Sequence, residues 1–170
     1  TSVDTGFIAG DQTFYKTSNG GATWTNILGG TNSILSVYFT DASKGYAVGF
    51  DSWTFDGCAF KTMDGGSSWY PLSTGTTDGL WSVCFTGSDT GIIVGDNGTI
   101  LKTIDGSTTW TANSAATAKL NSVYFTDAST GYAVGEGTIL KTIDGGATWS
   151  ALSGGAAHSL NSVYFTNVNT

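Results

Sequence analysis

The stretch Thr142–Trp149, TIDGGATW, decides the fold of this chain because its pattern occurs four times. The other three copies are Thr17–Trp24 (TSNGGATW), Thr62–Trp69 (TMDGGSSW) and Thr103–Trp110 (TIDGSTTW); we call these octets the boxes. The tryptophans that end the boxes are 45, 41 and 39 residues apart. A second marker, Ser-Val-x-Phe, ends at Phe39, Phe85, Phe125 and Phe165. A period near forty residues is typical of propellers and solenoids.

Each repeat contains four short β-branched or aromatic runs separated by glycine-rich turns, which predicts an all-β fold. We name the four expected strands A to D in chain order. They are A at 35–39, 81–85, 121–125 and 161–165; B at 6–10, 45–49, 91–95 and 131–135; C at 13–17, 58–62, 99–103 and 138–142; and D at 23–28, 68–72, 109–112 and 148–152. Four strands per repeat predict the blades of a β-propeller. Proline cannot donate to a strand ladder, so Pro71 predicts that strand D is the outer edge.

We expect one propeller domain over residues 1–170, with four repeats. The expected blades are 6–30 plus 160–165, 34–73, 80–113 and 120–153. Residues 160–165 are a strand A without its own B, C and D, and the simplest closure pairs them with 6–10 to complete the first blade. Two alternatives stay open: a longer repeat array, or pairing with a second molecule to give a homo-oligomer or filament.

The boxes resemble the Asp-box, also called the bacterial neuraminidase repeat. The whole unit is similar to the repeats of photosystem II assembly-factor-like proteins and their secreted bacterial relatives. The resemblance covers essentially the whole chain and implies a β-propeller. Two positions depart from the pattern, because Asn19 replaces the aspartate of the first box and Ser107 replaces the second glycine of the third.

We expect the boxes to be structural hairpins between strands C and D. Their glycines permit positive φ, and the aspartate carboxylate is placed to accept hydrogen bonds from turn amides. The tryptophan is expected to cover the blade core. The expected structural residues are Asn19, Trp24, Asp64, Trp69, Asp105, Trp110, Asp144 and Trp149.

Charge and composition argue against several functions. The net charge is −7, with six lysines and no arginine, which opposes nucleic-acid binding. No run of eighteen apolar residues is present, so no membrane insertion is expected. The sialidases that the resemblance suggests need an arginine cluster, and lysine lacks the planar fork. We expect no cofactor, no metal and no catalytic residue, and therefore not an enzyme; glycoside hydrolysis by Asp96 and Glu136 is a remote alternative.

The second repeat carries an insert, Phe50–Gly57 (FDSWTFDG), between its strands B and C. Long loops on one face of a repeat protein often bind partners. Strand alternation puts this insert on the same rim as the other B–C turns and the D–A loops. The candidate ligand-binding rim is Phe50, Asp51, Trp53, Phe55, Asp96, Glu136 and His158. We expect an extracellular or cell-surface scaffold with a protein or glycan partner, or alternatively a glycan- or peptide-binding module centred on the insert.

The two cysteines interrupt the repeat. Cys58 stands where other repeats have threonine, and Cys84 stands where they have tyrosine. Because both cysteines depart from the repeat, a disulfide between them is favoured, but the sequence does not establish the geometry that a disulfide needs.

Overall fold

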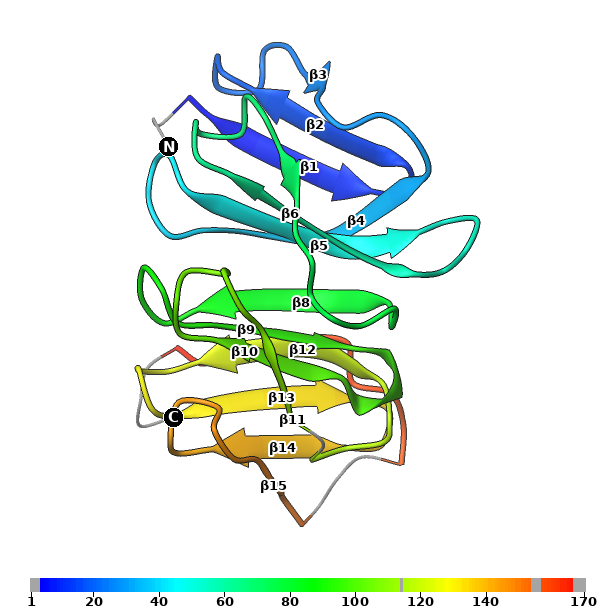
Figure 1. Ribbon diagram of the computed structural model, residues 1–170, viewed down its shortest axis with the longest axis vertical. Helices are drawn as coiled ribbons and strands as arrows, with labels where there is room; N and C mark the ends of the chain where they lie inside the picture. The colour runs from blue at the N-terminus through cyan, green and yellow to red at the C-terminus, as the bar shows by residue number, and fades with distance from the viewer. Residues whose placement is uncertain (1–3, 114, 154–156, 167–170) are drawn as a thin grey trace. The chain divides into compact units, whose positions relative to one another are not determined.

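A computed structural model describes residues 4–113, 115–153 and 157–166 of the chain. The chain forms two compact units, Thr1–Leu80 and Trp81–Thr170, and each is described by itself. Both units are built from antiparallel strands joined by short turns (Figure 1). No helix among the described residues is long and apolar enough to cross a membrane.

The first unit holds two sheets. One has the order β1-β2-β3 and the other has the order β4-β5-β6-β7. The strands are β1 (Gly6–Gly10), β2 (Thr13–Thr17), β3 (Thr25–Asn26), β4 (Asn32–Phe39), β5 (Gly45–Asp51), β6 (Gly57–Thr62) and β7 (Tyr70–Pro71).

The second unit also holds two sheets, each with four strands in chain order. The strands are β8 (Leu80–Phe85, whose first residue closes the first unit), β9 (Gly91–Gly95), β10 (Ile100–Thr103), β11 (Thr111–Asn113), β12 (Leu120–Phe125), β13 (Gly131–Gly135), β14 (Ile139–Thr142) and β15 (Ser150–Ala151). A three-residue 3-10 turn, Asp96–Gly98, connects β9 to β10.

These sheets confirm the all-β class and the four-repeat blade pattern of a propeller. In the three four-stranded sheets, strands A, B, C and D follow one another, as in β12-β13-β14-β15. Pro71 lies in β7, the outermost strand of its sheet, as its missing N–H predicts. The single-domain organisation over residues 1–170 stays a prediction.

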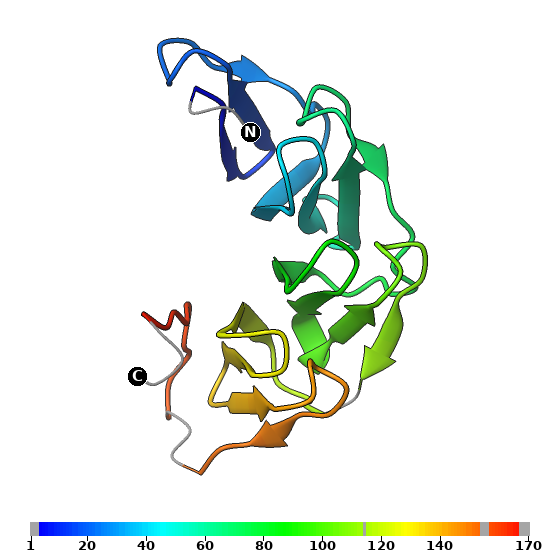
Figure 2. The ribbon, with the colours of Figure 1, turned by 90° about the vertical axis from the view of Figure 1, so that its left-hand side faces the viewer.

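The expected completion of the first blade by residues 160–165 would join the two units, and it stays a prediction. The first sheet has three strands, and residues 160–165 belong to no sheet. They lie instead against the fourth blade, where the Val163 amide donates to Ser122 Oγ at 3.3 Å and Phe165 stacks on Tyr132 at 4.3 Å. Figure 2 shows this segment in red beside the yellow strands β12 and β13.

One contact recurs in the three complete blades. The first glycine of strand B packs under the phenylalanine that ends strand A: a Cβ built on Gly45, Gly91 or Gly131 would lie 2.6, 2.6 or 2.7 Å from the ring of Phe39, Phe85 or Phe125. The same ring meets the tryptophan of the blade's box edge-on. The ring centroids are 6.0, 6.4 and 6.0 Å apart for Phe39–Trp69, Phe85–Trp110 and Phe125–Trp149. Strand A is thus tied to both strand B and the C–D hairpin.

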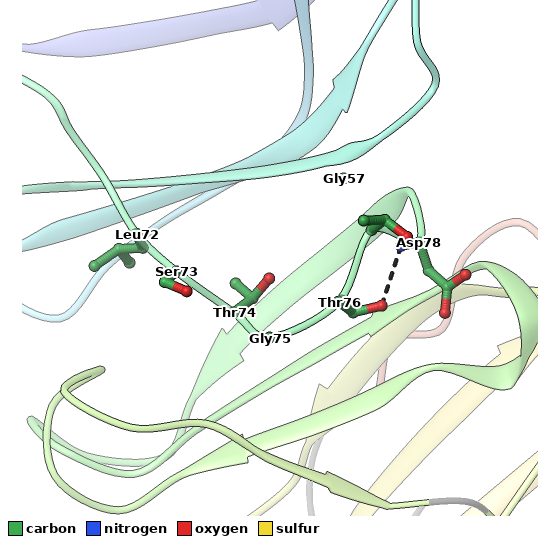
Figure 3. A pocket seen from close by; sticks show the side chains of 8 residues that line it. Gly57, Leu72, Ser73, Thr74, Gly75, Thr76 and Asp78 are labelled. Carbon is green, nitrogen blue, oxygen red and sulfur yellow. Dashed lines mark hydrogen bonds between the residues drawn. The ribbon is translucent and has the colours of Figure 1, made fainter.

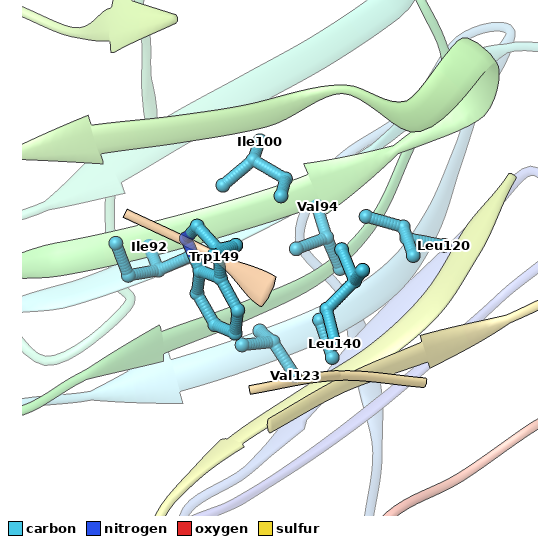
Figure 4. Close-up of a cluster of buried hydrophobic side chains, with 8 residues drawn as sticks. Ile92, Val94, Ile100, Leu120, Val123, Leu140 and Trp149 are labelled. Carbon is cyan, nitrogen blue, oxygen red and sulfur yellow. The ribbon is translucent and has the colours of Figure 1, made fainter. Parts of the chain in front are cut away.

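The hydrophobic core lies between successive blades. In the second unit it combines Ile92, Val94 and Ile100 of the third blade with fourth-blade residues, namely Leu120, Val123, Leu140 and Trp149 (Figure 4). These side chains are buried, with at most 8% of each exposed. A blade therefore buries its apolar surface against its neighbour, as repeat architectures require.

Both cysteines are free, so the disulfide that the repeat exceptions favoured is not formed. Burial raises the pKa of the Cys58 thiol to about 11 and also raises the pKa of Cys84. Partial burial in an apolar environment makes both thiols structural rather than reactive.

Gly131→Ala is expected to destabilise the chain by about 1–3 kcal/mol, because the added methyl group must displace the packed Phe125 ring. The measurement is the free energy of unfolding in urea. The matched control is Gly87→Ala, where a Cβ meets nothing within 4 Å. Equal stability of the two variants would contradict the packing role of the glycine.

Candidate functional site

The box aspartates are engaged within their own hairpins. Asp144 Oδ1 accepts hydrogen bonds from Thr142 Oγ1 at 2.8 Å and from the Thr148 amide at 2.9 Å, and Asp144 Oδ2 accepts one from Thr148 Oγ1 at 2.5 Å. Thr142 Oγ1 in turn accepts from the Gly146 amide at 2.9 Å. Asp64 and Asp105 make corresponding contacts in their boxes. These carboxylates close the C–D turn, which supports the structural assignment.

The two departures from the box pattern are accommodated in the same geometry. Asn19 Oδ1 accepts from Thr17 Oγ1 and from the Thr23 amide, both at 2.9 Å. Its amide nitrogen also donates to Thr23 Oγ1 at 2.9 Å, so an amide serves in place of the carboxylate. Ser107 adopts the positive φ of the glycine that it replaces, at 76°. Among the described residues, its buried hydroxyl lacks a hydrogen-bond partner.

Hydrogen bonds depress the pKa of the box carboxyls. The amide of Ser68 is the largest influence on Asp64 and the hydroxyl of Thr109 is the largest on Asp105, and each of these two pKa values falls to about 2. For Asp144 the largest influence is the hydroxyl of Thr148, and the pKa lies well below its ordinary value. The ionised carboxylates therefore stabilise the folded hairpins.

The insert Phe50–Gly57 lengthens β5 to Asp51, forms the loop 52–56, and begins β6 at Gly57 (Figure 1). Asp51 organises it: Asp51 Oδ1 accepts from the amides of Trp53 and Thr54 at 2.9 and 3.0 Å, and Asp51 Oδ2 accepts from Thr31 Oγ1. The Phe55 amide donates to the Asp51 carbonyl at 2.7 Å, and the Asp51 amide donates to the Asp56 carbonyl at 2.8 Å. Hydrogen bonds hold the pKa of Asp51 below its ordinary value. The bond from the Thr31 hydroxyl has the largest effect, followed by those from the amides of Thr54 and Trp53.

This scaffold presents two aromatic side chains to solvent. Trp53 is 78% exposed and Phe55 is 70% exposed. Phe55 adopts φ = 64°, a conformation that is uncommon for a bulky residue. Its ring stacks on Phe50 with centroids 6.1 Å apart. A strained backbone that displays apolar rings is typical of a recognition site.

Polar groups adjoin the insert within the first unit. Ser33 Oγ donates to Asp11 Oδ1 at 2.6 Å and lies 2.6 Å from Ser52 Oγ. Asp11, in the turn between β1 and β2, therefore lies beside Ser52 of the insert.

An open hollow of about 510 Å³ begins where the insert ends (Figure 3). It is lined by Gly57 together with the loop that follows β7, namely Leu72, Ser73, Thr74, Gly75, Thr76, Thr77 and Asp78. The Gly57 amide donates to the Thr77 carbonyl at 2.8 Å, which anchors the loop to β6. Hydroxyl groups and one carboxyl group therefore lie next to Gly57, the last residue of the insert.

The remaining candidate rim residues belong to the second unit and are described apart. Asp96 accepts a hydrogen bond from Trp81 Nε1 at 2.9 Å and lies 4.0 Å from Lys119 Nζ, which covers the Trp81 ring at 3.2 Å from its centroid. The Glu136 amide donates to the Lys119 carbonyl at 2.9 Å. His158 is exposed. Lys119 thus meets the Asp96 carboxylate with its ammonium group and the Glu136 backbone with its carbonyl group.

Sequence reasoning missed two features. Trp81 and Lys119 form an intramolecular cation–π pair, which no motif announces. Met63, Ile104 and Ile143, each the second residue of its box, are 58%, 71% and 73% exposed. Their exposure could have been predicted from this shared position, because an apolar side chain between threonine and aspartate in a tight turn cannot reach the core.

The fold and the boxes together define a BNR-type β-propeller repeat protein. Residues 67–154, half of the chain, match the family described as Photosynthesis system II assembly factor YCF48. The chain therefore belongs to this family. A comparison with curated proteins found no match.

Solved structures agree on the fold. The chain is similar to an ancestral GH74 enzyme, with 18% sequence identity and a TM-score of 0.73 over 90% of this chain and 23% of the enzyme. It is also similar to YCF48 from Cyanidioschyzon merolae, with 17% sequence identity and a TM-score of 0.70 over 96% of this chain and 58% of that one. A YCF48 bound to D1 peptide gives 24% identity and a TM-score of 0.61, over 88% of this chain and 43% of that one. The chain thus spans less than two thirds of each of these structures.

The depressed pKa values predict acid sensitivity. Because the folded pKa of Asp64 and of Asp105 is about 2, below the ordinary 3.8, the boxes stabilise the fold fully above pH ~4 and lose that contribution as the pH falls towards ~2. The triple variant Asp64→Asn, Asp105→Asn, Asp144→Asn should remain folded at pH 7, since Asn19 already serves in this role. Its melting temperature should fall less than that of the wild type over this acid range. An unchanged acid slope would contradict the role of the box carboxylates.

Proposed function

We propose that this chain is a non-catalytic, protein-binding propeller module that captures an extended peptide segment at the insert Phe50–Gly57. The observation that carries the proposal is the exposed aromatic pair Trp53 and Phe55 on a loop whose backbone Asp51 fixes. Exposed aromatic side chains on an ordered loop give large contact area at low entropic cost. The family membership adds support, because one YCF48 structure contains a bound D1 peptide.

The surroundings of the insert favour a peptide with basic residues. Asp11, Asp51, Asp56 and Asp78 lie in or beside the loop, and the chain carries a net charge of −7. A lysine or arginine side chain can lie over the exposed Trp53 ring as a cation–π contact while nearby carboxylates attract its charge. The proposal extends to an extracellular or cell-surface setting, which low lysine content and Ser/Thr/Gly-rich turns support.

A second candidate function is glycan binding at the same place. The observation that favours it is the hollow that begins at Gly57 of the insert, which offers Ser73, Thr74, Thr76 and Asp78 as hydrogen-bonding groups, while the insert itself supplies aromatic rings. Aromatic faces with a few polar groups are the usual composition of a small-ligand site. Binding of the chain to glycan arrays and to peptide arrays separates the two functions, since a glycan site would bind sugars and not peptides.

The double variant Trp53→Ala, Phe55→Ala is expected to weaken peptide binding by roughly tenfold or more, the scale of losing aromatic anchor residues. The measurement is titration calorimetry with peptides selected on an array that includes basic peptides and the D1 peptide. The matched control is Met63→Ala with Tyr70→Ala, which removes two exposed apolar side chains from the same unit but outside the insert. Full affinity in the insert variant, or equal loss in the control, would contradict the proposal.

Asp51→Ala provides an independent test of loop organisation. Losing the acceptor for the Trp53 and Thr54 amides should weaken binding by increasing loop freedom, while the exposed aromatic side chains remain present. Hydrogen exchange of these two amides should quicken in parallel. Unchanged affinity with faster exchange would show that the ordered loop is not needed for recognition.

A further inference from the structure

A lysine stands immediately before the threonine of every box, and its contact with the next blade differs between the two units. In the first unit, Lys16 Nζ donates to Ser67 Oγ of the second box at 3.1 Å. In the second unit, Lys102 also reaches the box of the next blade, since its Nζ lies 3.8 Å from a Cβ built on Gly145. The residue there that corresponds to Ser67 is Ala147. Lys102 therefore lacks the hydroxyl acceptor that Lys16 has.

No other group of the described residues replaces that acceptor. Among them, the ammonium group of Lys102 makes no hydrogen bond, ion pair or cation–π contact. The carboxylates of the two adjoining boxes, Asp105 and Asp144, accept hydrogen bonds from the threonines of their own turns. Lys102 is thus a cation that its own blades leave available, in a chain with a net charge of −7.

A groove of about 320 Å³ lies at this lysine. Its lining joins Lys102, Ile104 and strand β11 of the third blade to Gly146 and Ala147 of the fourth box, all within the second unit. Ile104 is 71% exposed. Asn113 Nδ2 donates to the Ala147 carbonyl at 2.8 Å and ties the two walls together. A groove whose described lining has a lysine as its charged residue favours a ligand that carries an anionic group.

The groove borders the outer edge of β11. The strand registers place Ala112 of β11 at the position that Pro71 holds in β7. The residue after Pro71, Leu72, donates its amide to the Ala59 carbonyl at 2.8 Å. Since ladder hydrogen bonds alternate along an antiparallel pair, the backbone groups at the Pro71 position point away from the sheet. Ala112 retains its N–H at this position, so β11 offers both a donor and an acceptor to an added strand.

We propose that this groove binds an extended segment of a partner protein that carries an aspartate or a glutamate. The backbone of the segment pairs with Ala112 at the edge of β11, and its carboxylate accepts a hydrogen bond from Lys102, where Ser67 accepts one from Lys16. A peptide fits better than an acidic sugar, because only another backbone matches the donor and acceptor of a strand edge. The site lies in the second unit and shares no residue with the insert.

The first test measures binding to an array of short acetylated peptides with alternating apolar and polar residues. Each peptide carries one glutamate and has a twin with glutamine in its place. The wild type should bind the best glutamate peptide roughly tenfold more tightly than its twin in titration calorimetry. Lys102→Met should abolish this preference. Lys141→Met, the equivalent change in β14, and the insert variant Trp53→Ala, Phe55→Ala should both retain it.

The missing hydroxyl group provides a second test. Ala147→Ser supplies the acceptor that Ser67 gives to Lys16, so the glutamate peptide must compete with it and should lose roughly threefold in affinity. Ala147 is exposed, and the change should leave the fold intact. The matched control is Ala22→Ser, at the same position of the first box, which should bind the peptide as the wild type does.

The third test addresses the strand edge. Ala112→Pro should remain folded, because β7 holds proline at this position, and it should weaken the glutamate peptide by roughly tenfold through the lost N–H. Ala151→Pro, the equivalent change in β15, should have no effect on binding.

Three results would overturn the proposal. One is an array on which the wild type shows no preference for glutamate over glutamine. Another is full affinity in the folded Ala112→Pro variant. The third is binding of oligogalacturonate, an acidic sugar, that Lys102→Met abolishes while the peptides fail to bind.

Discussion

The contact of one phenylalanine with one glycine and one tryptophan supports each complete blade. Phe125 ends strand A, covers Gly131 at the start of strand B, and meets Trp149 of the box edge-on. A glycine is required because any side chain there would collide with the ring. The box in turn fixes the tryptophan, since Thr142, Asp144 and Thr148 close the hairpin that carries it. Three elements that are distant in sequence therefore depend on one ring.

This constraint separates structural from functional parts of the repeat. The polar groups of the boxes close the turns that carry them. The insert obeys no such constraint, because Phe50–Gly57 extends beyond the repeated unit. Asp51 nevertheless orders it, and Trp53 and Phe55 face solvent. Recognition can thus vary at a loop while the blade beneath it is held by the repeat.

Much of the fold could be predicted from the sequence because the period and the turn glycines are repeated four times. Strand B matched its predicted bounds in three repeats, and Pro71 identified the outer strand. Strand D was predicted too long, since residues such as Thr148 donate to the box aspartate instead of extending the strand. In the site, the length of the insert was visible, but the positive φ of Phe55 and the contacts of Asp51 depend on loop geometry that repeat comparison cannot supply. The environment of 160–165 was also beyond reach, because an identical sequence in β12 has different neighbours.

Because the account rests on the contact between the strand-A phenylalanine and the box tryptophan, a double-mutant cycle on Phe125 and Trp149 tests it most directly. The free energy of unfolding in urea is measured for the wild type, Phe125→Leu, Trp149→Leu and the double variant. The account predicts a coupling energy of about 0.5–1.5 kcal/mol between the two positions, the scale of an aromatic pair. Strictly additive effects of the two substitutions would contradict it.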